Sequence, residues 1–201
     1  MDWTQRKALR FANLAKVFFL FVFAFSLVCQ TEAFASSNEL DICYVGQYTS
    51  EEKSHSEELI KEILSQEGIE LRDAGEWKVE YGTPKTISSS GYAGNQPSRG
   101  TRFNTGGGFY FSSGGGPSVS VGVSFPSPYG SFTVSCNLGN VGASGRFVTV
   151  PSSEYYYKLY VTQYKSVKPS AVYKKVNGVW QLWLTDYTVI DTWEDCYAVR
   201  V

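Results

Sequence analysis

Four carboxylates near the C-terminus are the first residues of this chain that could do chemistry: Asp186, Asp191, Glu194 and Asp195. Two carboxyl groups can serve a glycosidase as acid and nucleophile, and carboxylate oxygens can also hold calcium. Residues 191–195, DTWED, lack the regular Asp spacing and the Gly of a dedicated calcium loop. Their composition is typical of a polar turn between two strands. We therefore predict a turn there, and keep a glycoside hydrolase built on Asp191 and Glu194 as an alternative.

Other residue types that catalyse reactions are sparse. The sequence has one histidine, His55, which falls in the first turn of a predicted helix and is expected to be solvated. Neither a Gly-x-Ser-x-Gly nucleophile motif nor a Gly-x-x-x-x-Gly-Lys phosphate loop occurs. We predict no catalytic residues, no metal site and no cofactor, and expect that the protein is not an enzyme.

Aromatic side chains are the candidates for a binding surface. They are Trp180, Trp183, Trp193 and Tyr156. Alternation along a strand turns about half of such residues outward, where they could stack on sugars or contact a membrane. The alternative is that they only close the rims of a small sheet.

The N-terminal residues 1–35 are predicted to be a secretory signal peptide. Four basic residues precede the uncharged run 17–29, and Ala33-Phe34-Ala35 has the small-x-small pattern of a cleavage site. The run covers about 20 Å, short of the roughly 30 Å of a bilayer core. We therefore expect a secreted protein without a permanent membrane anchor; a lipoprotein attached at Cys29 is the alternative. The long signal and β-rich body resemble small exported proteins of Gram-positive bacteria.

Charge and composition divide the remaining chain into three parts. Residues 36–81 form an acidic strand–helix segment, residues 82–116 a Gly/Ser-rich linker or loop, and residues 117–201 an antiparallel β domain. Residues 36–80 hold 12 acidic and 4 basic side chains, net −8, whereas residues 81–201 hold 5 acidic and 10 basic, net +5. The two parts should attract each other, but the basic part lacks the dense Lys/Arg stripe of a nucleic-acid-binding protein.

Three cysteines remain after the predicted cleavage: Cys43, Cys136 and Cys196. Cys136 follows Phe132 and Val134 at a period of two, so we expect it to be buried. An exported chain can oxidise the other two. The sequence therefore predicts a disulfide between Cys43 and Cys196.

One short amphipathic helix is predicted near the N-terminus of the mature chain. Ser54 and Glu57 have the spacing of a capping box, an apolar stripe follows, and Gly68 stops the pattern. The stripe is expected to dock on the protein's own sheet.

The rest of the sequence predicts strands. Residues 114–139 alternate apolar and small residues, and a turn at Ser127–Gly130 would place Val123 opposite Val134. Asn177-Gly178 is the preferred pair for a two-residue hairpin turn and would place Val176 opposite Val179. About seven or eight short strands result. We predict a mainly β protein, either an antiparallel sandwich or a partly open barrel.

These observations favour a non-catalytic binding or interaction module outside the cell. Its partner is expected to be another protein or a surface glycan, not nucleic acid. A second hypothesis is a proprotein whose acidic segment is released from a basic antimicrobial or toxin-like β domain. The glycoside hydrolase is the third.

Overall fold

The computed structural model describes residues 40–201, which form one compact unit. The predicted signal peptide and Cys29 lie outside the described residues. Within them the protein is mainly β, and its sheets do not close into a barrel. The elements are β1 (Asp41–Val45), α2 (Ser50–Glu67), a 3-10 turn (Leu71–Asp73), β2 (Glu76–Tyr81), β3 (Lys85–Tyr92), β4 (Gly108–Ser112), β5 (Ser118–Ser124), β6 (Ser131–Asn137), β7 (Asn140–Gly142), β8 (Arg146–Thr149), β9 (Tyr157–Val176) and β10 (Val179–Arg200).

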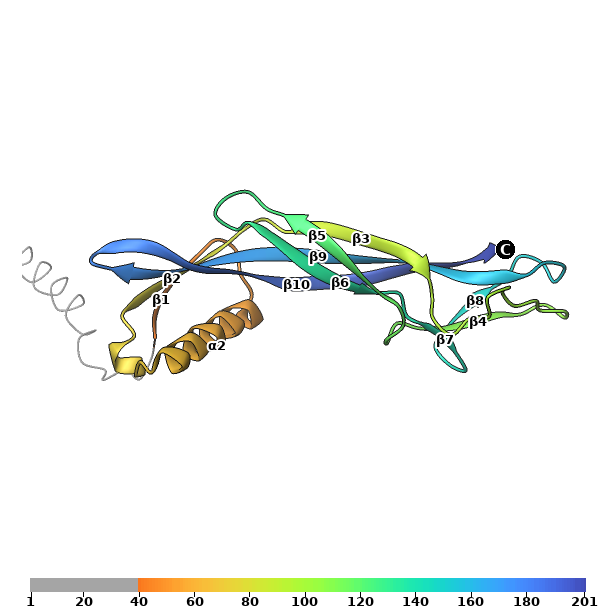
Figure 1. Cartoon of the computed structure of the whole chain (residues 1–201), viewed down its shortest axis with the longest axis horizontal. Coiled ribbons are helices and arrows are strands. Elements are labelled where there is room, and N and C mark those ends of the chain that lie inside the picture. The colour runs from red at the N-terminus through yellow and green to blue at the C-terminus, as the bar shows by residue number, and fades with distance from the viewer. Residues whose placement is uncertain (1–39) are drawn as a thin grey trace, which may run out of the picture. The chain divides into compact units, whose positions relative to one another are not determined.

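Two long strands, β9 and β10, form an antiparallel hairpin that runs through the structure (Figure 1). The predicted turn at 177–178 is confirmed, because Asn177 and Gly178 have φ angles of 52° and 79°, as a type I′ turn requires. Val176 pairs with Val179, also as predicted. β-Bulges interrupt the register of β10 between 182 and 184 and between 189 and 191.

The polar turn predicted at residues 191–195 is wrong. These residues belong to β10 and pair one by one with residues 162–166 of β9. Their charged side chains suited a turn, but the partner strand continues past them, so the backbone stays in the ladder. Two continuous strands of 20 and 22 residues therefore replace the several short strands predicted for this part of the chain.

The second edge of β9 is occupied by two strands in succession. β2 pairs with residues 170–174 and β3 with residues 160–167, both antiparallel. They are separated at Gly82–Pro84, opposite Pro169, which has no N–H to give to a neighbouring strand. β1 extends this sheet by pairing with β2 in parallel. The prediction of a purely antiparallel sheet is therefore wrong at this edge.

Two smaller sheets complete the β structure. One has the order β7-β4-β8 and the other is the β5–β6 hairpin. The expected linker over 82–116 thus contains β3 and β4, because pairing with other strands holds its Gly/Ser-rich backbone. The register predicted for the β5–β6 hairpin is wrong by two residues: Val123 pairs with Phe132. The turn is longer than expected, with Phe125 donating its N–H to the Gly130 carbonyl, but a shift of two keeps the same side chains on the buried face.

Helix α2 begins about one turn earlier than predicted. The capping box consists of Thr49 and Glu52, not Ser54 and Glu57, and Gly68 adopts the left-handed conformation after the last turn. Ile60 and Leu64 on its apolar stripe are fully buried in a core with Trp77, Val79 and Val172. The helix therefore packs on the sheet formed by β1, β2 and β9.

Strand β9 buries opposite faces toward its two ends. Near its start, odd-numbered Leu159, Val161 and Val167 are fully buried beneath the two smaller sheets. Near its end, even-numbered Val172 is fully buried against α2. Because successive side chains of a strand point to opposite faces, the even-numbered side chains from 158 to 166 lie on a face that neither layer covers, and none of them is buried.

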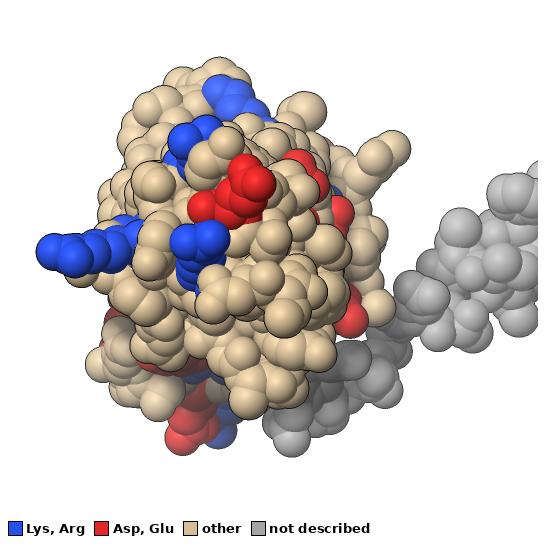
Figure 2. Space-filling model, turned by 90° about the vertical axis from the view of Figure 1, so that its right-hand side faces the viewer, with Lys and Arg blue, Asp and Glu red and all other residues tan. Residues whose placement is uncertain are grey.

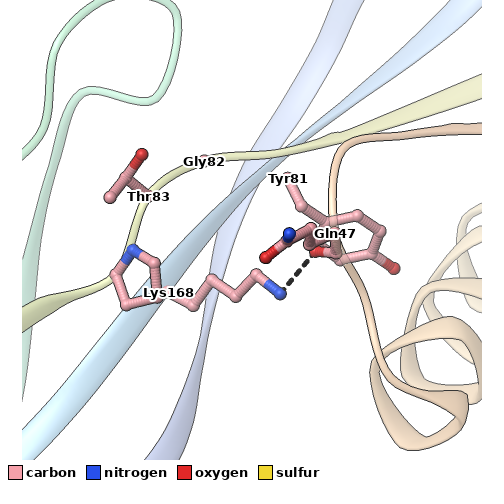
Figure 3. Close-up of a pocket in the computed structure, with 6 residues that line it drawn as sticks. Gln47, Tyr81, Gly82, Thr83 and Lys168 are labelled. Atoms are coloured by element: carbon pink, nitrogen blue, oxygen red, sulfur yellow. Dashed lines mark hydrogen bonds between the residues drawn. The ribbon is translucent and has the colours of Figure 1, made fainter.

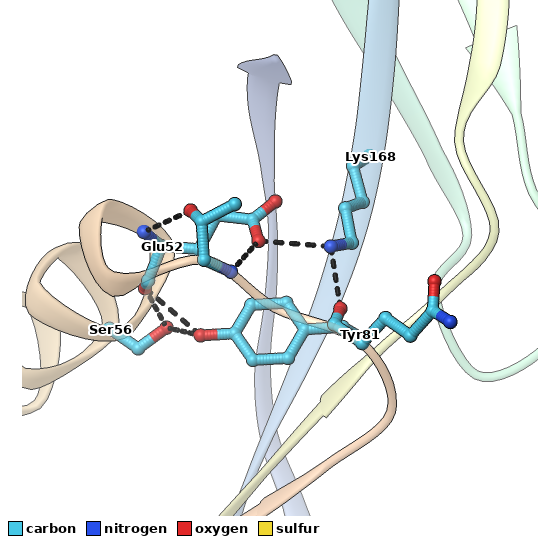
Figure 4. A network of polar contacts seen from close by, with 6 residues as sticks. Glu52, Ser56, Tyr81 and Lys168 are labelled. Carbon is cyan, nitrogen blue, oxygen red and sulfur yellow. Dashed lines mark hydrogen bonds and ion pairs between the residues drawn. The ribbon is translucent and has the colours of Figure 1, made fainter.

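A buried ion pair fixes the start of α2 to β9 (Figure 4). The Lys168 ammonium donates to Glu52 Oε2 at 2.9 Å and to the Gln47 carbonyl at 2.6 Å. Tyr81 adds a second link, since its hydroxyl donates to the Glu52 carbonyl at 2.9 Å and contacts the Ser56 hydroxyl at 2.7 Å. Glu52 Oε1 is buried without a partner among the described residues, so the ammonium is the main compensation for this carboxylate.

The predicted disulfide between Cys43 and Cys196 is not formed, and both residues are free thiols. Through the pairing of β1, β2 and β9, Cys43 lies level with position 173 of β9, whereas Cys196 pairs with position 161. Twelve residues of strand correspond to about 40 Å, far more than the roughly 7 Å between Cα atoms that a disulfide allows. Cys136 is fully buried, as predicted.

Replacing Lys168 by Met should destabilise the fold by about 3–5 kcal/mol, because Glu52 would remain buried and unpaired. The double variant Lys168→Met/Glu52→Gln should recover most of this loss, since Gln can still cap the helix. Urea unfolding measures both. Lys175→Met, which breaks an exposed pair with Glu76, is the control and should cost less than about 1 kcal/mol; equal losses for the two single variants would contradict the assignment.

Alkaline pH should also destabilise the protein. Burial, followed by contact with Glu80, raises the pKa of Tyr173 to about 12, and burial raises the pKa of Tyr44 and Tyr81 above the usual 10. Folding therefore favours the neutral phenols. Their contribution is complete below pH 10 and is lost as the pH rises toward 12. Unfolding midpoints measured from pH 8 to 12 should fall above pH 10, and should fall less steeply in Tyr173→Phe.

Candidate functional site

The carboxylates singled out in the sequence do not converge. Asp191 pairs with Ser166, and Glu194 pairs with Gln163, so the two side chains point to opposite faces of β10. They cannot flank one glycosidic bond as acid and nucleophile. Asp186 instead lies 2.8 Å from His55 Nε2 of α2, a contact between distant segments that the sequence did not indicate.

Two cavities flank the break between β2 and β3. One, of about 260 Å³, is lined by Gln47, Tyr81, Thr83 and Lys168 among others (Figure 3). The Lys168 ammonium there already binds Gln47 and Glu52, which gives it a structural role. The other, of about 330 Å³, is lined mainly by proline and aromatic side chains. Within residues 40–201 no three His, Cys, Asp or Glu side chains gather as metal ligands, and no helix is long and apolar enough to span a membrane.

The predicted aromatic surface is also divided. Trp183 packs edge-on against Trp77, with ring centroids 6.1 Å apart, at the margin of the core under α2. Trp180 lies near Lys78 and Lys175, on the other face of the hairpin. Tyr156 is exposed just before β9. Trp193 alone of the four lies on the uncovered face.

Trp193 is part of a regular grid on the uncovered face of β3, β9 and β10. Strand register places these residues in four successive rows: Tyr92, Tyr160 and Tyr197; Ser90, Thr162 and Asp195; Ser88, Tyr164 and Trp193; Thr86, Ser166 and Asp191. We call these twelve residues the aromatic face. Rows that contain aromatic rings thus alternate with rows that combine hydroxyl groups and one carboxylate.

The rings of the aromatic face contact one another and remain open to solvent. Tyr160 lies 5.3 Å from Tyr92 and 5.6 Å from Tyr197, centroid to centroid, and Tyr164 stacks on Trp193 at 5.3 Å with an interplanar angle of 7°. Tyr92 is 43% exposed, Trp193 41% and Tyr197 51%. Such a large exposed aromatic patch on a folded domain is typical of a binding surface.

The two carboxylates of the aromatic face are not neutralised. Asp191 accepts the N–H of Thr192 at 2.8 Å, but neither Asp191 nor Asp195 forms an ion pair with any residue of the described range. Figure 2, which views the structure from the right-hand side of Figure 1, shows that most of this end of the molecule is uncharged and that a few Lys, Arg, Asp and Glu side chains are scattered over it. The acidic groups of the aromatic face are therefore free to meet a ligand.

Sequence reasoning missed most of this face, although part of the signal was present. Tyr160 and Tyr164 are four residues apart, as are Trp193 and Tyr197, so each pair would lie on one face of any strand that contains it. This spacing determines on which face of its own strand each aromatic residue lies. It does not fix which strands are neighbours, and that pairing is what brings Tyr92 of β3 beside them.

No protein-family model matches this chain, and no curated protein or solved structure matches it either.

If the aromatic face is a surface and not a core, its removal should cost little stability. Trp193→Ala should lower the free energy of unfolding by about 1 kcal/mol, the value of one aromatic pair. Trp77→Ala, at a site that is 1% exposed, should lower it by about 3–5 kcal/mol. Urea unfolding followed by circular dichroism compares them, and a similar loss in both variants would show that Trp193 serves packing.

Proposed function

We propose that the protein is a non-catalytic interaction module, and that the aromatic face is its binding surface. The observation that carries this proposal is the exposure of several aromatic rings in contact with one another on a face of β3, β9 and β10 that the smaller sheets and α2 leave uncovered. An exposed cluster of this kind is costly to keep in water unless it meets a partner.

The grid suits an elongated ligand. Rings on β9 and β10 recur every four residues, about 13 Å along a strand, and hydroxyl groups lie between them. In this proposal the smaller sheets pack on the opposite face as the second layer of an open sandwich, and they stiffen the sheet that presents the rings. The predicted signal peptide places this module outside the cell, where an extended segment of another protein or a surface glycan is the ligand.

Replacing Trp193 and Tyr197 together by Thr should abolish binding, because Thr keeps the strand preference but removes both rings. The purified protein and this variant would be compared on a glycan array and on an array of unstructured peptides. We expect at least one class of ligand to bind the parent protein and not the variant.

The matched control is the double variant Tyr110→Thr/Phe147→Thr. These residues form another exposed cross-strand aromatic pair, with centroids 5.1 Å apart, on β4 and β8. The control should retain full binding. Binding that survives in the Trp193/Tyr197 variant, or is lost equally in both, would refute the aromatic face as the site.

A further inference from the structure

We infer that the ligand of the aromatic face is an extended, cationic peptide segment whose Lys or Arg side chains recur every four residues. This inference rests on the proposed function, since it assigns the chemistry of the partner at the same surface. Three observations support it: the order of side chains along β10, the unpaired aspartates on that strand, and the side chains that occupy backbone groups at its edge.

Strand β10 presents a single row in which acids and rings alternate: Asp191, Trp193, Asp195 and Tyr197. All four residues are exposed. Asp191 and Asp195 are four residues apart, which corresponds to about 13 Å along a strand. An extended chain lying along β10 has the same repeat, so side chains four positions apart would reach both carboxylates.

A cation that binds in this row gains two favourable interactions. An ammonium or guanidinium can pair with an aspartate and also lie over the face of the adjacent ring, which attracts it through the ring quadrupole. The protein already uses this contact on the same face, where Lys158 Nζ lies 5.1 Å from the centroid of Tyr92. Asp191 and Asp195 have no such partner in the described chain, and a neutral sugar would leave their charge uncompensated.

Two backbone groups on the free edge of β10 beside this row are occupied by side chains. Asp191 occupies the N–H of Thr192 at 2.8 Å, and Arg146 of β8 donates to the carbonyl of Glu194 at 3.3 Å. Side-chain contacts of this kind protect a strand edge from pairing with another chain. Recognition therefore occurs through side chains on the face, and not by addition of the ligand as a further strand.

The test uses two nine-residue peptides of the same composition, seven Thr and two Lys. In one peptide the Lys residues stand at positions 3 and 7, on one side of an extended chain; in the other they stand at positions 3 and 6, on opposite sides. We expect the first to bind about tenfold more tightly by fluorescence anisotropy, because it brings one more lysine to the face, which gains both an ion pair with an aspartate and a contact with the adjacent ring. The difference should shrink as salt is raised.

Variants that remove carboxylates test whether the preference for the first peptide depends on Asp191 and Asp195. Asp191→Asn/Asp195→Asn should remove the preference for the first peptide, while Asn still caps the Thr192 N–H. Glu194→Gln, which removes a carboxylate from the opposite face of the same strand, should leave the preference unchanged. Methylation of the peptide backbone nitrogens should leave binding within about twofold, because the peptide gives no backbone hydrogen bonds to β10.

The outcomes separate this inference from the proposed function. Equal binding of the two peptides, or a preference that survives Asp191→Asn/Asp195→Asn, overturns the inference. Loss of binding on backbone methylation also overturns it, in favour of strand addition. If only neutral glycans bind, and do so through Trp193 and Tyr197, the inference fails and the proposed function stands. If no ligand depends on those rings, both fail.

Discussion

The antiparallel pairing of β9 with β10 is the constraint on which the rest of the structure depends. Every residue of β9 from 157 to 176 pairs with a residue of β10, and β10 has an extra residue at each of two bulges. The other side of β9 serves β2 and β3 in turn, and Pro169 marks the place where one replaces the other. Every other layer packs on this ladder, so the hairpin determines where each of them can lie.

The alternation of side chains along this hairpin also determines which surfaces remain free. The smaller sheets cover odd-numbered residues near the start of β9, and α2 covers even-numbered residues near its end. A sheet covered on opposite faces at its two ends leaves an uncovered stretch at each end, and one of these lies on the even-numbered side of the start of β9. The aromatic face occupies that stretch, and its rings share it with hydroxyl groups and two unpaired carboxylates.

Ion pairs join the acidic and basic parts of the chain. Three ion pairs cross between them: Glu52 with Lys168, Glu67 with Lys174 and Glu76 with Lys175. Only the first is buried, and it holds the start of α2 where the helix also buries Ile60 and Leu64. The acidic segment is thus attached by packing as well as by charge, and a fragment without it would lose β2 and the cover over Val172.

The sequence by itself determined the features that depend on neighbouring residues. Asn177-Gly178 specified the hairpin turn because its positive φ angles suit few other pairs, and the period of two identified the buried side of β6, including Cys136. Neither depends on what lies across the sheet. The same reasoning placed the helix cap about one turn late, since two Ser/Thr-x-x-Glu pairs, at 49–52 and at 54–57, follow one another and the structure uses the first.

Tertiary structure alone decided the length of β10, the separation of Cys43 from Cys196 and the composition of the aromatic face. Residues 191–195 have the composition of a turn, and they form a strand because β9 continues opposite them. Tyr92 is remote in sequence from Trp193, and register between three strands brings them onto one surface. The physical reason is common to all three: a period of two fixes the face on which a residue lies, whereas partner and register are set by contacts between distant segments, which a local pattern does not contain.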